Sequence, residues 1–214
     1  MDVDIKVAKV VGLFNEFKKK DSRVESLPYN GYAENENFNL FLSTGGRIVQ
    51  RRDQFMQVWA MPLLKEGNKK STFYDNLIAK DYKELQWQDL VNKTTDLAAS
   101  ILQSTHLKTG RYQVEFTTDS LSEFFQMFSG IFSGKSVVNK VNAWQKLVGQ
   151  KVFHDDLTLV DDTHLKDAFS HYQCDGEGFK HLPTTLIENG VLKTFLHNSA
   201  TAKELGVKNT FHAV

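Results

Sequence analysis

The feature that most constrains the fold is a two-residue break between two β-rich runs near the C-terminus. Thr184–Glu188 and Val191–Leu196 are separated by Asn189-Gly190. Asn-Gly favours a type I′ turn, because this turn needs positive φ at both central residues, and the turn sets the pairing of its flanking strands. The sequence therefore predicts an antiparallel hairpin in which Ile187 faces Leu192. Because apolar residues fall on both of its faces, the hairpin needs cover on both sides.

A short helix is expected directly after this hairpin. Asn198 or Ser199 can cap its first turn, because a side-chain oxygen there accepts a hydrogen bond from an unpaired N–H group. Gly206 is typical of the residue that follows the C-terminal end of a helix. The stretch from Cys174 to Gly206 is thus predicted to be a loop, a hairpin and a capped helix.

Three further helices are indicated by apolar residues at helical spacing. The first runs from Val3 to Phe17, and the second begins near Asp89. The third follows Ser120, which forms the S-x-x-E pattern of a capping box with Glu123. We expect this third helix in the core, since burial of each phenylalanine contributes about 1.5–3 kcal/mol. Its apolar side holds Leu121, Phe124, Phe125, Phe128, Ile131 and Phe132.

Strand-like runs lie between the predicted helices. They cover residues 38–42, 47–50 and 54–64, and alternation predicts a half-buried strand over 112–116. Ser43–Gly46 is read as a turn and Glu66–Lys70 as a polar loop. Pro62 predicts an edge position or an end of pairing, because proline has no N–H group to donate. Hairpins and separate helices without a βαβ rhythm favour an α+β fold, with antiparallel sheets, packed helices and two sub-domains.

Composition excludes several classes of protein. Lysine plus arginine and aspartate plus glutamate both number 26, so the formal net charge is zero, which argues against a nucleic-acid groove or a polybasic membrane patch. A single cysteine, Cys174, is typical of a reducing compartment. The N-terminus lacks a signal-peptide pattern, and no apolar run approaches the ~20 residues that span a bilayer. We therefore expect a cytoplasmic protein that binds neither nucleic acid nor membrane.

The glycine-rich segment Gly130–Ser136 has the wrong spacing for a phosphate-binding loop. Three residues, not four, separate Gly130 from Gly134-Lys135, and the segment follows a predicted helix where the motif needs a strand. We interpret it as a glycine turn at the end of a helix.

Potential metal ligands and nucleophiles are present without a diagnostic spacing. They include His154, Asp155, Asp156, Asp161, Asp162, His164, His171 and His181. None forms an HExxH motif, so we interpret them as solvated loop residues and predict no metal ligand. Cys174 has no cationic neighbour in sequence that would lower its pKa, and we interpret it as a bystander.

Asp175 and Glu177 are the most prominent paired carboxylates. Two carboxylates so close in sequence can share acid–base work. Alternatively, Gly176 and Gly178 need unusual backbone angles, and the carboxylates hold the loop by capping or hydrogen bonds. The second interpretation is favoured.

Several separately placed motifs carry a resemblance. Asp175–Gly178 reads DGEG, Leu186–Lys193 reads LIENGVLK, and Thr201-Ala202 precedes a Leu-Gly pair, while KTGRY, GQ and LTLVDD occur upstream in order. This order is similar to that of the TldD/PmbA family, which was named for modulators of DNA gyrase and is understood as peptide-processing metalloproteases. The resemblance implies a structural or peptide-binding role for the matching residues. These are Gly149, Asp175, Glu177, Gly178, Glu188, Asn189, Gly190, Thr201, Ala202 and Thr210.

The chain departs from the family pattern at two places. Thr210 matches the threonine of the family's TGN motif, but Phe211 and His212 replace the glycine and the asparagine. The catalytic branch carries HExxxH on a helix upstream of the GQ pair. Phe125–Gly130 falls there in this chain, and no histidine lies within residues 107–153. The chain thus resembles the PmbA/TldE-like branch, which implies no catalytic residue, no metal and no cofactor.

Family members are considerably longer, so the resemblance implies a partial-length member. Residues 1–107 are expected to form the latter part of the family's N-terminal α+β domain. Residues 108–214 are expected to form the first part of its C-terminal domain, with the boundary near His106–Gly110.

The resemblance implies a non-catalytic component of a TldD/PmbA metalloprotease system that acts in peptide maturation or proteolysis. The expected partners are a TldD-like metalloprotease subunit, in a homo- or hetero-oligomer, and an extended peptide held by strand addition. Two alternatives stay open. One is an autonomous hydrolase that uses Asp175, Glu177 and histidines, and the other is an interaction or scaffold module of the gyrase-modulator type.

Overall fold

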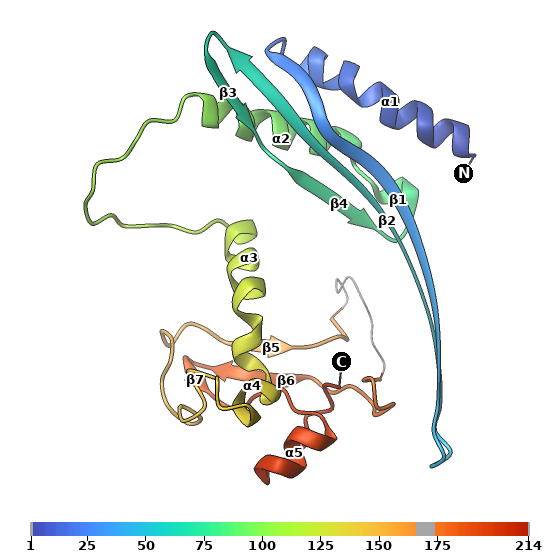
Figure 1. Cartoon of the computed structure of the whole chain (residues 1–214), viewed down its shortest axis with the longest axis vertical. Coiled ribbons are helices and arrows are strands. Elements are labelled where there is room, and N and C mark those ends of the chain that lie inside the picture. Colours follow the sequence, from blue (N-terminus) through green and yellow to red (C-terminus); the bar gives the residue numbers. More distant parts are fainter. Residues whose placement is uncertain (1, 166–173, 214) are drawn as a thin grey trace. The chain divides into compact units, whose positions relative to one another are not determined.

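The computed structural model describes residues 2–165 and 174–213 (Figure 1). The chain divides into two compact units. The first comprises Met1–Asn39 and Arg51–Gly110, and the second comprises Leu40–Gln50 and Arg111–Val214. Antiparallel strand pairs and separate helices give an α+β fold, as the sequence predicts.

The first unit is built on a four-stranded sheet with two helices. Its elements are α1 (Val3–Lys20), β1 (Val24–Leu42), β2 (Ile48–Glu66), β3 (Lys69–Thr72), β4 (Asp75–Ala79), the 3₁₀ helix η1 (Tyr82–Glu84) and α2 (Trp87–Leu102). The strand order is β1-β2-β3, and β4 also pairs with β2. Asp2 caps α1, as expected for a helix that begins at residue 3, because its side chain accepts a hydrogen bond from the N–H of Asp4.

One face of this sheet shares its core with α1 and α2. Every second residue of β2 from Met56 to Leu64 is buried, which is the period of a strand with one covered face. Phe17 of α1 and Leu90 of α2 are fully buried in the same cluster. Both helices are therefore held by apolar packing on the sheet.

Several details of the first unit correct the sequence predictions. β1 begins at Val24, well before the predicted start at residue 38. The earlier part was not predicted, because this strand is exposed and rich in polar residues and therefore lacks the apolar alternation that indicates a strand. Glu66–Lys70 is not a loop, since only residues 67 and 68 separate β2 from β3. Pro62 agrees with the second of its two predicted alternatives: it lies in an inner strand, but at the break where pairing of β2 with β4 ends at Ala60 and pairing with β3 begins at Leu63.

The second unit holds a three-stranded sheet in the order β5-β6-β7. Its elements are α3 (Thr118–Phe128), the 3₁₀ helix η2 (Ser129–Phe132), α4 (Gly134–Val138), β5 (Leu159–Asp161), β6 (Thr184–Glu188), β7 (Val191–Leu192) and α5 (Ser199–Leu205). The predicted hairpin is present, with Ile187 facing Leu192 and positive φ at both Asn189 (48°) and Gly190 (78°). Leu186, Ile187, Leu192, Phe195 and Phe132 form the buried core of this unit.

The second strand of the hairpin is shorter than predicted. β7 ends at Leu192, although the N–H of Lys193 still donates to the carbonyl of Leu186. Beyond this point the chain pairs elsewhere: the N–H of Leu196 donates to Phe132, and the N–H of Gly134 donates to the carbonyl of Leu196. The β-rich run from Val191 to Leu196 therefore pairs first with β6 and then, at Leu196, with the segment around Phe132 and Gly134.

The segment before and including α3 also differs from expectation. No residue of α3 is buried within the part of the chain that the structure describes, so the helix is not a core element there. Its N-cap is Thr117, whose hydroxyl accepts from the N–H of Ser120, so Ser120 lies in the first turn. Residues 112–116 are exposed and form no strand, because no described strand pairs with them. Among the described residues, no helix combines the length and the apolar character needed to cross a bilayer.

Candidate functional site

The DGEG loop (Asp175–Gly178) is organised by the first of its carboxylates. Oδ1 of Asp175 accepts hydrogen bonds from the N–H groups of Glu177 (3.1 Å) and Phe179 (2.8 Å). Gly178 has a φ of +74°, which lies in the left-handed region that favours glycine. Asp175 thus holds its own loop, in line with the favoured interpretation of the sequence.

The second carboxylate serves a different element. Oε2 of Glu177 accepts hydrogen bonds from both the N–H and the hydroxyl of Ser199, in the first turn of α5. Asn198 caps the same helix end, because its side chain accepts from the N–H of Thr201 (2.9 Å) while the Thr201 hydroxyl accepts from the N–H of Asn198 (3.1 Å). Asp175 and Glu177 are therefore engaged with separate partners.

The DGEG loop also fixes the C-terminal segment (Thr210–Ala213). The N–H of Gly176 donates to the carbonyl of Ala213 (2.8 Å), and the N–H of Ala213 donates to Oδ2 of Asp175 (3.2 Å). Phe179 and Phe211 pack their rings at a centroid distance of 5.2 Å. The loop thus determines where the side chain of residue 212, which lies between these contacts, is placed.

His212 meets Asp161 and His181 in a group that we call the His–Asp cluster. One ligand atom from each of the three side chains lies within 4.8 Å of the others. Nε2 of His212 is 3.2 Å from Oδ1 of Asp161, and the rings of His181 and His212 pack edge to face at 4.4 Å. The bond to His212 lowers the pKa of Asp161, and burial lowers the pKa of His181, which favours its neutral form.

This cluster corrects part of the sequence interpretation. His181 is 8% exposed, so it is not a solvated residue, and the His212 side chain is equally buried. His154 is exposed as expected, and His171 lies outside the described residues. The sequence feature that could have indicated a role for His212 is the replacement of the family's asparagine by histidine at this position. No sequence pattern, however, indicates that His212 lies next to Asp161.

The tip of the β1–β2 hairpin (Leu40–Gln50) contacts the DGEG loop. Nη1 of Arg47 donates to the carbonyl oxygen of Glu177 (2.8 Å), and its guanidinium lies over the ring of Phe179. A Cβ atom on Gly178 would lie 2.6 Å from the ring of Phe41, so this approach also requires glycine. No local sequence pattern connects the tip with this loop, because 130 residues separate Arg47 from Glu177.

The remaining signature residues lie around the hairpin turn or in α5. Gly149 (φ +81°) donates its N–H to the carbonyl of Leu192, and a Cβ atom on Gly190 would collide with the carbonyl of Phe153. Glu188 pairs with Lys193 at 3.0 Å. Thr201 and Ala202 of α5 are buried, and the Thr210 hydroxyl bonds to the backbone of residue 197. The structure thus places the ten residues in two groups, one at the turn and one around the DGEG loop and α5.

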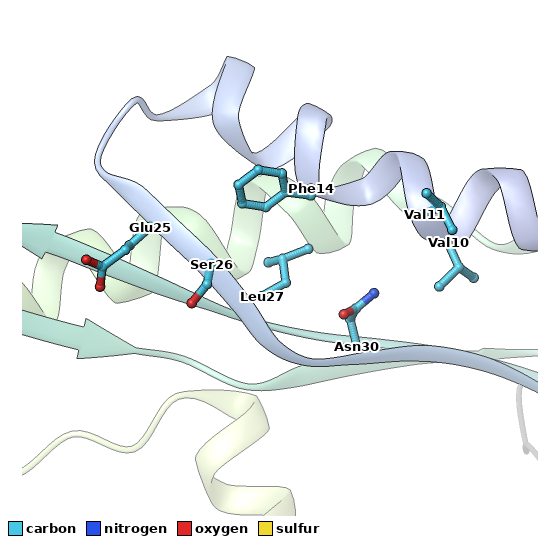
Figure 2. A pocket seen from close by; sticks show the side chains of 7 residues that line it. All are labelled: Val10, Val11, Phe14, Glu25, Ser26, Leu27 and Asn30. Carbon is cyan, nitrogen blue, oxygen red and sulfur yellow. The ribbon is translucent and has the colours of Figure 1, made fainter.

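A pocket of about 420 Å³ lies in the first unit, between α1 and β1 (Figure 2). Val10, Val11 and Phe14 come from the helix, and Glu25, Ser26, Leu27 and Asn30 come from the strand. Glu25 is its titratable side chain, and ion pairs with Lys70 and Lys65 lower the pKa of that carboxyl. This lining offers an apolar recess and no pair of groups suited to acid–base chemistry.

Comparison with known proteins assigns the second unit to a class of metallopeptidase-related domains. Residues 109–214 match the family model described as the PmbA/TldA metallopeptidase C-terminal domain. The chain belongs to the TldD/PmbA family. The resemblance based on the DGEG, LIENGVLK and TA motifs is thereby confirmed.

Individual relatives agree with this assignment. The chain is 21% identical to a metalloprotease of Methanocaldococcus jannaschii over 98% of the chain and 47% of that protein. It is 27% identical to a PmbA metalloprotease homologue of Haemophilus influenzae over 65% of the chain and 31% of that protein.

Solved structures show the same fold. A Thermotoga maritima protein, proposed to be a modulator of a DNA gyrase, superimposes with a TM-score of 0.91 at 24% identity, over 99% of this chain and 49% of that one. TldE from Thermococcus kodakarensis gives a TM-score of 0.79 at 20% identity, over 99% and 48%. The chain therefore spans about half the length of relatives that match nearly all of it.

Proposed function

We propose that this chain is a non-catalytic, PmbA/TldE-like component of a TldD/PmbA metalloprotease system. In this proposal it acts in the cytoplasm with a TldD-like metalloprotease subunit, in the maturation or proteolysis of peptides. Support comes from the helix α3, which takes the place of the family's zinc-binding helix in the sequence. The residues at this position decide whether the chain itself can bind a catalytic zinc ion.

The residues at this position do not fit zinc. Phe125 and Gly130 fall where the two histidines of HExxxH would be, and Gln126 falls where the glutamate would be. The ring of Phe125 packs against Phe124 and Phe153, as a packing residue does. Neither a phenyl ring nor a glycine can donate an electron pair to zinc, and glutamine is a poor base. A zinc-dependent step would then come from a partner subunit.

The exposed side of α3 supports a role in contacting that partner. Leu121, Phe124, Met127 and Phe128 are all at least 39% exposed, and Met127 reaches 78%. An apolar patch of this kind typically marks a protein–protein contact. The Asp175 and Glu177 carboxylates, which the alternative of an autonomous hydrolase would use, are already engaged with the loop and with α5.

Co-expression with a TldD-like metalloprotease from the same genome tests the proposal. We expect the two chains to co-purify and peptide cleavage to require both. Met127→Glu should weaken the complex at least tenfold, whereas Val141→Glu, at an equally exposed position (77%), should not. Cleavage of peptides by this chain alone would contradict the proposal and favour the autonomous hydrolase.

A further inference from the structure

The His–Asp cluster joins three side chains that are far apart in sequence. Asp161 ends β5, His181 lies between the DGEG loop and β6, and His212 belongs to the C-terminal segment. The hydrogen bonds of Ala213 to Asp175 and Gly176 hold the backbone beside His212, so the cluster is positioned by the fold. This arrangement has the fixed backbone support that a binding site requires.

His212 is held through both of its ring nitrogens. Nδ1 lies 3.1 Å from the Thr210 hydroxyl, which also bonds to the backbone carbonyl of His197, and Nε2 lies 3.2 Å from Oδ1 of Asp161. These two contacts fix the plane of the ring, so an imidazole nitrogen and a carboxylate oxygen are held side by side as potential ligands.

A second, independent observation points to the same place. Nδ1 of His181 is buried and has no hydrogen-bond partner among the described residues, although the residue is only 8% exposed. Leaving a buried polar nitrogen unsatisfied costs about 1–3 kcal/mol. A ligand at the cluster that accepts an electron pair would remove this cost, because His181 is packed directly on the ring of His212.

The donor set identifies the kind of cation. Two imidazoles and one carboxylate are ligands that Zn²⁺ and similar divalent transition ions prefer, whereas Mg²⁺ and Ca²⁺ prefer oxygen alone. Ligand atoms around tetrahedral zinc lie about 3.3 Å apart, and those of the cluster all lie within 4.8 Å of one another, so they must approach by at most about 1.5 Å to bind one ion. Asp161 keeps 36% of its side chain exposed, which leaves room for a water molecule as a fourth ligand.

We propose that Asp161, His181 and His212 form a binding site for a divalent transition-metal ion of the Zn²⁺ kind. Thr210 acts as a positioning residue, because its hydroxyl orients the ring of His212, as residues around a metal site commonly do. The proposal concerns ion binding by this chain alone and does not rest on the proposed protease partnership.

The test uses the full chain without a histidine tag. We expect equilibrium dialysis with ZnCl₂ to show one Zn²⁺ per chain, and isothermal titration to show that Asp161→Asn and His212→Asn each weaken binding roughly tenfold or more. His212→Asn introduces the residue that the family pattern has at this position, so it is suited to preserve the fold. In the wild-type chain, Co²⁺ should give the visible absorption of a four- or five-coordinate site, which requires no variant.

His154→Ala is the matched control, because His154 forms an exposed pair with Asp156 at 3.2 Å, with side chains 80% and 92% exposed. This variant should bind Zn²⁺ like the wild type. Absence of Zn²⁺ binding, equal affinity in the wild type and the His212→Asn variant, or displacement of Zn²⁺ by equimolar Mg²⁺ would each overturn the inference. So would a loss in His154→Ala that matches the loss in His212→Asn.

Discussion

Arg47 lies over the ring of Phe179, with its guanidinium carbon 3.9 Å from the ring centroid. The same guanidinium donates to the carbonyl oxygen of Glu177 at 2.8 Å. A planar guanidinium can stack and donate at once, which an ammonium group cannot do with the same geometry. One side chain therefore ties the hairpin tip to both Glu177 and Phe179.

The first prediction follows from this contact. Arg47→Lys keeps the charge but loses the stacked plane, so we expect the DGEG loop to open more readily, by about 1 kcal/mol. Amide hydrogen exchange of residues 175–180 should accelerate roughly fivefold. Arg52→Lys is the control, because Arg52 is 71% exposed and forms a surface ion pair with Glu36. Equal effects of the two substitutions would show that the stacking on Phe179 contributes nothing.

The second prediction separates backbone strain from steric conflict at the DGEG loop. Gly178 and Gly149 both have positive φ, at +74° and +81°, but only Gly178 has a neighbour, Phe41, at its missing Cβ. Gly149→Ala should lower the free energy of unfolding by about 1–2 kcal/mol, because alanine is strained in the left-handed backbone conformation. Gly178→Ala should lower it further, because the ring of Phe41 must also move.

A double-mutant cycle checks this account by urea denaturation. In a Phe41→Ala background, the cost of Gly178→Ala should fall to that of Gly149→Ala, since only the backbone term remains. An unchanged cost in that background would mean that Phe41 does not restrict the loop.

The third prediction concerns the cap of α5. Asn198→Ala removes the acceptor for the N–H of Thr201 and should lower the free energy of unfolding by about 1 kcal/mol. Asn198→Asp keeps a side-chain oxygen at the helix N-terminus and should restore most of this loss. Thermal denaturation of the three proteins measures the difference. If both variants lose the same amount, the cap hydrogen bond is not what stabilises this end of the helix.

Local chemistry explains which parts of the fold the sequence could predict. The turn at Asn189-Gly190 and the helix from Asn198 to Gly206 depend on backbone angles and caps that a few adjacent residues determine, and both are present. The prediction that α3 is buried was wrong, because an apolar stripe indicates that a helix face needs a partner but not where that partner is.

The candidate site was harder to predict than the hairpin for a related reason. His212 lies next to Asp161 and His181 where the DGEG loop binds the backbone of the following residue, Ala213, which is 38 residues after Asp175. No period or spacing in the sequence encodes such a contact. The DGEG loop itself was found, because its alternating glycines and carboxylates are a local pattern.

The junction between α1 and β1 contains a close ion pair with a predictable pH dependence. Asp21 follows the last residue of α1, and its N–H donates to the carbonyl of Phe17. Its carboxylate accepts from the Arg23 side chain, with Nη2 at 2.7 Å and Nε at 3.1 Å, and from the Arg23 N–H at 2.9 Å. These bonds to Arg23 hold the pKa of Asp21 below its usual value of 3.8.

The fourth prediction applies linkage to this pair. A carboxyl whose pKa is lower in the folded state stabilises the fold fully above the unfolded pKa, and this contribution is lost as pH falls through the folded pKa. Asp21→Asn should therefore cost about 1 kcal/mol at pH 7, and the cost should shrink below about pH 4. Melting temperatures of the wild type and the variant, compared at pH 7 and pH 3, measure this change. Asp156→Asn, at a side chain that is 92% exposed, should change the melting temperature little at either pH. A penalty for Asp21→Asn that is the same at both pH values would show that hydrogen-bond geometry alone, and not the charge on Asp21, stabilises the junction.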